Sequence, residues 1–359
     1  MTEEIIRVKI DDMLARPTKG YWLYVNYDNE AFMNTGIQES SATPPFASTT
    51  TGPGGEAIKG KVGIKQDILE GFALMGLRSG FFATANPAYP QDLIGKVIDA
   101  LTTPGASFIT VLSSCQRGWR HEENLTNQVE KLATESGYFP LYSVHVRDGK
   151  PFYTLNEPVN FNKDKVIEWV KALGKFRHLF KPEFMEENLE FLTDSIRQRT
   201  QNILDLVEQF NPGHKIEKYT VPLNKLANQE HIAPGHGLCL GCGEGQIITQ
   251  VAAGATAVAG NNVVYTNATS CLEVSTSKDN TPSWKVPWVH HLFETSATMG
   301  DALSTAFRTL AVKGKLAGEP PRVISLGGDG GTFDIGYQWL KGAIGRQGAY
   351  GVMSKLLNP

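Results

Sequence analysis

The chain has 359 residues, of which 41% are hydrophobic, so it can bury one large core or two moderate ones. Its net charge of −3, with acids and bases interspersed, gives no electrostatic reason to expect binding to nucleic acid or to an anionic membrane. No stretch approaches the roughly 18 apolar residues of a membrane-spanning helix, and the first residues lack the pattern of a secretory signal, so we expect a cytoplasmic protein.

The amino-terminal part of the chain predicts one strand followed by a polar loop. Residues 1–20 are mixed in character and end in a turn, which indicates a short surface element. From Trp22 to Tyr27, aromatic and β-branched residues alternate as in a strand. The polar segment 28–36 follows at its carboxyl end, where open α/β sheets bind ligands. The loop 40–55, rich in Ser, Thr, Pro and Gly, is expected to cover that site.

Helices and strands alternate in the next part of the chain, as they do around a parallel sheet. We expect a helix at 67–75, a strand at 81–84, a helix at 90–101, a strand at 107–112, a hairpin within 138–153 and a helix at 163–173. The strand at 107–112 leads into Cys115, and we expect this cysteine at the same edge of the sheet as Asn29.

A long amphipathic helix is predicted for residues 183–210. Apolar residues recur there at intervals of three, four or seven on a charged background, and the helix would be roughly 40 Å long. It could pack on the surface of the domain or offer a coiled-coil surface to a partner. A polar linker is expected at 214–235.

The carboxyl-terminal part has a different composition and holds the two sharpest motifs. We expect a C-x-x-C segment at 234–245, a helix at 246–259, a strand at 262–266, a loop at 268–273, a loop at 284–288, a helix at 296–313 and a strand at 323–326. After that last strand, the chain enters the glycine-rich turn 327–336, which should open a further helix to about residue 345.

The Gly-Asp-Gly turn after the last strand is typical of a phosphate site. Glycines let the backbone approach an anion, and the amides at the start of the following helix point toward it. Asp329 can hold a divalent cation that bridges the phosphates. A diphosphate with magnesium is therefore the expected ligand, and the second metal ligand must come from elsewhere in the chain.

The four cysteines are too few for a disulfide framework and suggest metal or redox chemistry. Cys239 and Cys242 form a C-x-x-C pair, whereas Cys115 and Cys271 stand alone. One pair with two distant single cysteines favours an iron–sulfur cubane over a structural zinc, which commonly uses two pairs. Unligated thiols are the third alternative.

Together these motifs resemble the thiamine-diphosphate-binding β subunits of the 2-oxoacid:ferredoxin oxidoreductases, most of all those of the pyruvate:ferredoxin oxidoreductase (pyruvate synthase) group. The resemblance rests on residues 27–38, 40–44, 115–119, 235–244, 268–273, 286–290 and 327–336. It implies an α/β fold with a mostly parallel sheet and helices on both faces. Ser114 and Ser270 stand where the family usually has proline and glycine, and both are small enough to leave the neighbouring cysteines intact.

The resemblance also implies three cofactors, namely thiamine diphosphate, Mg²⁺ and a [4Fe-4S] cluster. The cluster would be bound by Cys115, Cys239, Cys242 and Cys271, and Mg²⁺ by Asp329, Asn29 and the carbonyl of Ala31. Contacts to thiamine diphosphate would come from Glu244, Gly328, Gly330, Gly331, Cys271 and the magnesium ligands. Asn34 would face the thiazolium and the substrate as the catalytic residue, although an asparagine at this place can also serve only the turn. His290 and His291 could transfer protons or only pack.

The implied activity is the oxidative decarboxylation of a 2-oxoacid to acyl-CoA and CO₂, with electrons leaving through the cluster to ferredoxin in anaerobic metabolism. The resemblance favours pyruvate as the 2-oxoacid and leaves branched-chain 2-oxoacids and oxalate as alternatives. The implied partners are an α subunit that supplies the carboxylate for the aminopyrimidine and contacts to the substrate, a γ subunit, and a ferredoxin-like δ subunit. Alone, the chain is expected to be inactive. The alternatives are a non-redox thiamine enzyme, such as a decarboxylase or an acetolactate-synthase-like protein, and an inactive rearranged chain.

The order of the segments departs from the family and suggests a circular permutation. We expect an extension at 1–20, the second half of the thiamine-diphosphate domain at 21–180, a helical tether and linker at 181–233, the first half at 234–346 and a frayed tail at 347–359. Breaks in exposed loops are the kind that folds tolerate. If the order is permuted, the strand that begins at Trp22 must lie next to the strand before the Gly-Asp-Gly turn.

Overall fold

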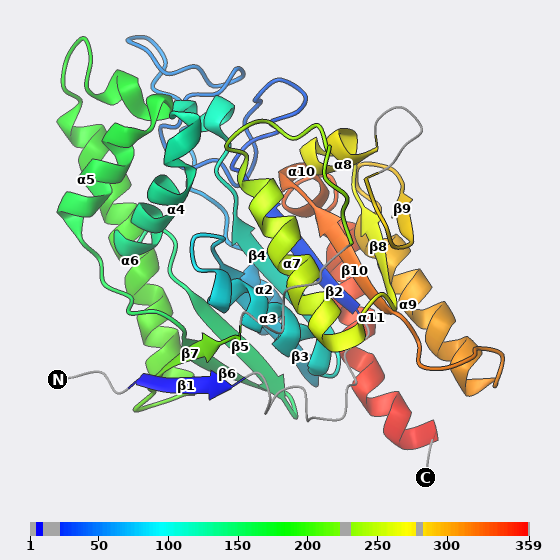
Figure 1. The fold of residues 1–359 in the computed structure, drawn as a ribbon. Helices are drawn as coiled ribbons and strands as arrows, with labels where there is room; N and C mark the ends of the chain where they lie inside the picture. Colours follow the sequence, from blue (N-terminus) through cyan, green and yellow to red (C-terminus); the bar gives the residue numbers. More distant parts are fainter. Residues whose placement is uncertain (1–4, 10–21, 223–230, 278–282, 358–359) are drawn as a thin grey trace.

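The computed structural model is built around a large, mostly parallel β-sheet (Figure 1). It describes residues 5–9, 22–222, 231–277 and 283–357. Within these residues the sheet has eight strands, and its hairpin β5–β6 runs antiparallel at one edge while the others are parallel. The strands, in sheet order, are β6 (Lys150–Leu155), β5 (Tyr142–Arg147), β3 (Ser79–Ala85), β4 (Ala106–Leu112), β2 (Trp22–Asp28), β10 (Arg322–Gly327), β8 (Val263–Asn267) and β9 (Trp288–His290). The predicted α/β fold is confirmed.

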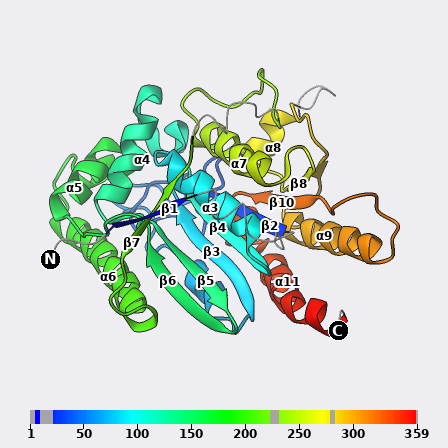
Figure 2. The same cartoon turned by 60° about the horizontal axis from the view of Figure 1, so that its bottom comes forward.

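Helices cover both faces of this sheet (Figure 2). One face carries α3 (Pro90–Thr102) and α7 (Gly243–Ala259), and the other carries α9 (Ser296–Val312) and α11 (Tyr337–Leu357). Alternate residues of β2 enter the two cores: Leu23 and Val25 pack with residues of α3 and α7, whereas Trp22 and Tyr24 pack with residues of α11. Because both faces are covered, all seven residues of this strand are buried.

The long amphipathic helix packs on the domain itself. It is α6 (Glu186–Phe210), and it begins three residues later than predicted. Its apolar stripe includes Leu192, Ile196 and Val207, all buried in the cores beside the hairpin β5–β6 and α5. The remaining helices are α2 (Leu69–Ala73), η1 (Gln116–Arg120), η2 (Glu123–Leu125), α4 (Thr126–Glu135), α5 (Lys163–Ala172), η3 (Gly174–Leu179), α8 (Cys271–Thr276) and α10 (Asp329–Thr332). None of the helices that the structure describes combines the length and the apolar character needed to span a membrane.

The strands β2 and β10 are direct neighbours, as predicted for the strand that begins at Trp22. They pair in parallel, with Val323 opposite Trp22 and Gly327 opposite Asn26. The Trp22 indole also donates to Ser325 Oγ across 3.0 Å. Two segments about three hundred residues apart therefore form the centre of one sheet.

One prediction about an irregular segment was wrong. The expected polar linker contains strand β7 (Ile216–Thr220), which pairs in parallel with β1 (Ile5–Lys9), a part of the expected surface element, as a small second sheet. A further edge strand that was not predicted, β9, begins at the last residue of the expected loop 284–288 and pairs with β8. These strands are short, and neither β7 (IEKYT) nor β9 (WVH) shows a clear alternation of apolar and polar residues, so the sequence pattern could not reveal them.

The helix after the Gly-Asp-Gly turn and the carboxyl-terminal tail also differ from prediction. The expected single helix is divided into α10 and α11, and the Gly336 amide returns to the Gly330 carbonyl across 2.9 Å at the break. The tail was expected to fray from residue 347, but α11 continues to Leu357. Gln347 is buried and bonds to Asp301 on α9, which anchors this part of α11.

Candidate functional site

The carboxyl ends of four adjacent strands bring the predicted site residues to one edge of the sheet, near α8 and α10 in Figure 1. Asn29 follows β2 and Asp329 follows β10. Cys115 follows β4 and Cys271 follows β8. Since parallel strands end at the same edge, residues from both halves of the chain meet there.

Glycines in the Gly-Asp-Gly turn are required by close packing. A Cβ atom on Gly327 would lie 2.0 Å from the Tyr24 hydroxyl, and one on Gly330 would lie 2.0 Å from the Phe293 ring. The Tyr24 hydroxyl donates to the Gly331 carbonyl across 3.0 Å, which ties the turn to β2. The turn therefore has a fixed position relative to the strand that leads into Asn29.

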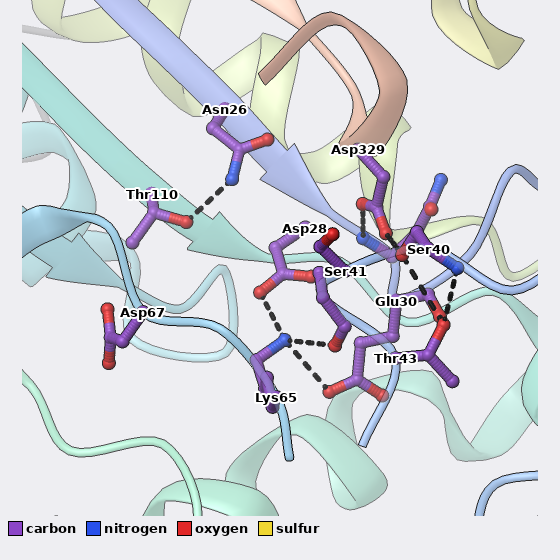
Figure 3. A network of polar contacts seen from close by, with 12 residues as sticks. Asn26, Asp28, Glu30, Ser40, Ser41, Thr43, Lys65, Asp67, Thr110 and Asp329 are labelled. Carbon is purple, nitrogen blue, oxygen red and sulfur yellow. Dashed lines mark hydrogen bonds and ion pairs between the residues drawn. The ribbon is translucent and has the colours of Figure 1, made fainter. Parts of the chain in front are cut away.

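Asp329 and Asn29 are bonded directly to one another. The backbone amide of Asn29 donates to Asp329 Oδ1 across 3.2 Å, and Ser40 donates to Asp329 Oδ2 across 2.6 Å. Figure 3 shows Asp329 and Ser40 facing one another. The side-chain oxygen of Asn29 is buried without a hydrogen-bond partner. An unpartnered buried carbonyl beside a carboxylate is the kind of oxygen pair that a hard cation uses.

Glu244 lies beneath this pair, in the first turn of α7. Its Oε1 accepts from the Asn29 amide group across 3.1 Å, and its Oε2 is buried without a partner. Burial raises the pKa of Glu244 to about 7, although the bond from Asn29 lowers it. This carboxyl group can therefore offer either an acceptor or a donor to a ligand.

A pocket opens above the Asn29–Asp329 pair. Four separate segments of the chain line it, and Asn34 lies at its exposed side with its amide donating to the Ser270 carbonyl across 3.4 Å. Eight of the residues predicted from sequence line this pocket, namely Asn29, Ala31, Asn34, Cys271, Gly328, Asp329, Gly330 and Gly331. The geometry brings these residues together, and their functions stay predictions.

The four cysteines lie in one region without forming a ready-made site for a single ion. Burial and the nearby Glu244 raise the pKa of Cys242 and of Cys271, and the other cysteines raise both further. Among the residues that the structure describes, no three His, Cys, Asp or Glu side chains are grouped so that they could hold one metal ion. Zinc needs its ligands around one atom, whereas each cysteine of a cubane binds a different iron. The iron–sulfur cluster and the zinc alternative both stay predictions.

Helix α4 joins the loops that contain the cysteines. Glu130 accepts from the amide of Ser114 across 2.9 Å, and the Ser114 carbonyl accepts from the Gly243 amide across 3.0 Å. One helical turn away, Thr126 donates to the Gly241 carbonyl across 2.6 Å. The loop before Cys115 and the loop around Cys242 are thus held against one helix.

The buried Glu130 leads to a prediction about stability and pH. Burial raises its pKa from 4.5 to about 8, and the bonds from Ser114 lower it only in part. The folded chain therefore binds a proton that the unfolded chain releases, so this stabilising contribution is complete below pH 4.5 and is lost as the pH rises toward 8. At each pH, the effect of Glu130→Gln is the free energy of unfolding of the variant minus that of the wild type. We expect this difference to be more favourable to the variant at pH 9 than at pH 5, by a few kcal/mol.

Urea unfolding of the wild type and the variant at the two pH values measures this difference. Glu168→Gln is the matched control, because Glu168 is an exposed glutamate on α5. Equal effects of Glu130→Gln at pH 5 and pH 9 would contradict the prediction.

The adjacent residues His290 and His291 lie in different surroundings. His290 Nε2 lies 3.0 Å from the Thr269 hydroxyl, and its Nδ1 lies 3.5 Å from a Glu273 oxygen. His291 Nδ1 lies 2.6 Å from the Thr295 hydroxyl. Neither histidine lines the pocket above Asp329, so a role in proton transfer there stays a prediction without direct support.

Sequence reasoning missed a buried network of charges next to Asp329 (Figure 3). Lys65 forms ion pairs with Asp28 and Glu30, and Glu30 also pairs with Lys175. The sequence did offer one indication, since acidic residues flank Asn29 on both sides and buried carboxylates need cationic partners. It could not show which lysines are those partners.

Comparison with known proteins places these motifs among characterised relatives, although no family model matches the chain. It is 39% identical to pyruvate synthase subunit PorB of Thermotoga maritima over 207 residues, which are 58% of this chain and 61% of that protein. It is 41% identical to the PorB subunit of Methanocaldococcus jannaschii over 44% of this chain and 50% of that protein. The chain is related to the β subunits of the 2-oxoacid:ferredoxin oxidoreductases. The resemblance seen in the sequence motifs is confirmed.

A second kind of subunit in this family is also similar. Ketoisovalerate oxidoreductase subunit VorB of Pyrococcus abyssi is 36% identical over 52% of this chain and 57% of that protein. PorB and VorB differ in the 2-oxoacid of their printed names, so similarity alone does not choose the substrate. The chain matches about half to three fifths of the length of these curated relatives.

Proposed function

We propose that this chain is the thiamine-diphosphate-binding β subunit of a 2-oxoacid:ferredoxin oxidoreductase. One observation above all supports it: Asn29 and Asp329 are bonded at one edge of the sheet although they lie at opposite ends of the chain. The unpartnered oxygen of Asn29 and the Asp329 carboxylate are ligands suited to Mg²⁺. The homology to PorB and VorB supports the same function.

The residues present fit thiamine diphosphate with Mg²⁺. Asp329, Asn29 and the Ala31 carbonyl would hold the metal, and the turn Gly328–Gly331 would lie against the diphosphate. Glu244 keeps a second carboxyl oxygen without a partner, which can bond to the cofactor. Bound thiamine diphosphate supplies a carbon nucleophile that adds to the keto carbon of a 2-oxoacid. Asn34, at the exposed side of the pocket, would orient the substrate with its amide group.

The proposed reaction converts a 2-oxoacid, pyruvate first of all, with coenzyme A to acyl-CoA and CO₂. Two electrons would leave one at a time through a [4Fe-4S] cluster held by Cys115, Cys239, Cys242 and Cys271, and would reduce ferredoxin. An α subunit would supply the carboxylate that pairs with the aminopyrimidine, with γ and ferredoxin-like δ subunits completing the complex. Because the partner completes the site, this chain alone is expected to bind the cofactor without turning over substrate.

The permuted segment order belongs to this proposal. The strand β2 lies beside β10, and the helices that follow the Gly-Asp-Gly turn cross one face of the sheet before α11 ends. A permutation would also explain why colinear similarity spans only part of each relative, since a colinear alignment cannot follow a reordered chain. The first half of the domain would then be 234–346 and the second half 21–180.

Iron content tests the redox function against a non-redox thiamine enzyme. We expect protein purified without oxygen to contain about four irons per chain and to absorb broadly near roughly 400 nm. Cys271→Ser should lower the iron content and alter the spectrum, because it removes one cluster ligand. Zinc in place of iron, or full thiamine diphosphate binding by an iron-free chain, would support the non-redox alternative instead.

Binding of thiamine diphosphate tests the cofactor assignment directly. The full chain should bind it only when Mg²⁺ is present, as measured by calorimetric titration with and without a chelator. Equal binding under both conditions would remove the magnesium site from the proposal.

A further inference from the structure

Lys65 is the centre of a buried polar network beside the Asn29–Asp329 pair (Figure 3). Its ammonium group donates to Asp28 Oδ2 across 2.6 Å and to the Ala42 carbonyl across 2.9 Å, and it lies 3.4 Å from Glu30 Oε1. The Lys65 side chain is 9% exposed, and those of Asp28 and Glu30 are 2% and 1% exposed. A cation this deep must be held by several acceptors at once.

The first two acceptors of Lys65 flank Asn29 in the sequence. Asp28 precedes Asn29 and Glu30 follows it, so both neighbours of that residue are fixed through one ammonium group. The loop that contains Ala31 is held from the other side, because Thr43 donates to the Glu30 carbonyl across 2.6 Å.

The third acceptor of Lys65 belongs to the loop that contacts Asp329. Ala42 lies two residues after Ser40, and Ser40 donates to Asp329 Oδ2 across 2.6 Å. One lysine therefore connects the segment with Asn29 and Ala31 to the segment that orients the Asp329 carboxylate. Lys65 itself contacts neither Asn29 nor Asp329 in any hydrogen bond that the described residues make.

We propose that Lys65 is a positioning residue for the magnesium site, holding its two halves in register through Asp28 and through the Ser40–Thr43 loop. This inference rests on the proposed function. Partners of metal ligands that fix the ligand geometry commonly change metal affinity by a factor of 10 to 100 when they are removed.

A positive charge near a cation site can also act by repulsion, and this effect has the opposite sign. If Lys65 acted only through its charge, its removal would tighten Mg²⁺ binding. If it acts through position, its removal loosens Mg²⁺ binding. The direction of the change therefore separates the two roles.

The test uses a variant that leaves no unpaired buried charge. Lys65→Met together with Asp28→Asn removes one ion pair and keeps the net charge of the network unchanged. The dissociation constant of Mn²⁺ is measured by electron paramagnetic resonance in the presence of thiamine diphosphate, and it should be on the order of tenfold higher in this double variant of the full chain than in Asp28→Asn alone. The single variant is the reference because loss of the Asp28 charge weakens cation binding by itself.

A second buried pair gives a matched control. Lys96 and Asp92 on α3 lie 2.7 Å apart with side chains 0% and 7% exposed. Lys96 also donates to a backbone carbonyl, that of Thr84, across 2.7 Å. The variant Lys96→Met with Asp92→Asn should lose stability in the same way and should leave the Mn²⁺ dissociation constant unchanged.

A third variant tests the route through the loop. Ser40→Ala should weaken Mn²⁺ binding by itself, and its effect should be smaller when Lys65 and Asp28 are already replaced, because both act on the same loop. This variant also covers the case in which the Lys65 variant does not fold, since unchanged Mn²⁺ binding in Ser40→Ala would overturn the inference.

The inference is overturned as well by unchanged or tighter binding in the Lys65 variant, or by an equal loss in the Lys96 control. A wild-type chain that binds neither thiamine diphosphate nor Mn²⁺ contradicts the proposed function instead.

Discussion

Replacing Asp329 by asparagine should abolish magnesium-dependent binding of thiamine diphosphate while the chain stays folded. Asparagine has the same shape: its side-chain oxygen can accept from the Asn29 amide, and its NH2 group can donate to the Ser40 hydroxyl, which is able to accept, so the turn should keep its structure. It lacks the charge that a divalent cation needs. Because loss of a group outside the ligand shell already costs about 10-fold to 100-fold in metal affinity, loss of this charged ligand should cost more than about 100-fold.

The metal-free Asp329→Asn variant should be no less stable than the wild type. Asp329 is fully buried, and Asp28 and Glu30 repel its charge, so its carboxylate is unfavourable until a cation binds. Asp301→Asn is the control, because Asp301 is also a buried aspartate but bonds to Arg346 and Gln347 on α11. Calorimetric titration measures binding, and urea unfolding measures stability. Wild-type affinity in Asp329→Asn would exclude it as a metal ligand.

Asn29 tests the other half of the same site, and β2 supplies its control. Asn29→Ala should weaken Mg²⁺-dependent binding strongly, because it removes the unpartnered side-chain oxygen of the residue that bonds to Asp329. Asn26 is also buried with an unpartnered side-chain oxygen, but its amide group donates to Thr110 on β4. Asn26→Ala should therefore lower stability without changing affinity. If Asn29→Ala and Asn26→Ala bind thiamine diphosphate with equal Mg²⁺-dependent affinity, Asn29 and Asp329 do not share a metal ion.

The sheet and its functional edge could be predicted because both depend on local sequence. The strands β2, β4 and β10 are runs of apolar and β-branched residues, and each ends in polar or glycine-rich segments. Once the order of strands is known, their carboxyl ends must meet at one edge. The adjacency of Trp22 and Val323 followed from the motif order, since local pattern alone does not determine which strands pair.

The ion network beside the site could not be predicted, because it depends on contacts between distant segments. Lys65 lies in a loop with no periodic pattern, and Lys175 is in η3, 145 residues from its partner Glu30. Each lysine looks like a surface residue in the sequence, since buried lysines are rare unless paired. Only the fold shows that two carboxylates around Asn29 are matched by two buried ammonium groups.

Lys175→Met should lower the free energy of unfolding by about 3–5 kcal/mol, which is the usual cost of removing one partner from a buried ion pair. The Lys175 ammonium group bonds to Glu30 and lies 3.9 Å from the centre of the Trp119 ring. Both side chains of the pair are almost completely buried, at 4% and 1% exposed. After the substitution, Glu30 keeps the Tyr138 hydroxyl and its longer ion pair with Lys65 at 3.4 Å, but Lys65 also pairs with Asp28 at 2.6 Å, so two buried carboxylates share one ammonium group.

Two further variants distinguish the stability lost by leaving a buried charge poorly compensated from the stability lost with the lysine side chain itself. Adding Glu30→Gln to Lys175→Met should recover a large part of the stability, because Lys65 then has one buried carboxylate to balance, that of Asp28, and no longer two. Lys171→Met removes an exposed lysine whose ammonium group lies 5.7 Å from the centre of the Phe180 ring, and it should cost at most about 1 kcal/mol. If Lys175→Met costs no more than Lys171→Met in urea unfolding, Glu30 does not depend on Lys175. The segment around Asn29 would then have to be held by Lys65 alone, and the Lys65 variant should show a correspondingly larger loss of Mn²⁺ affinity.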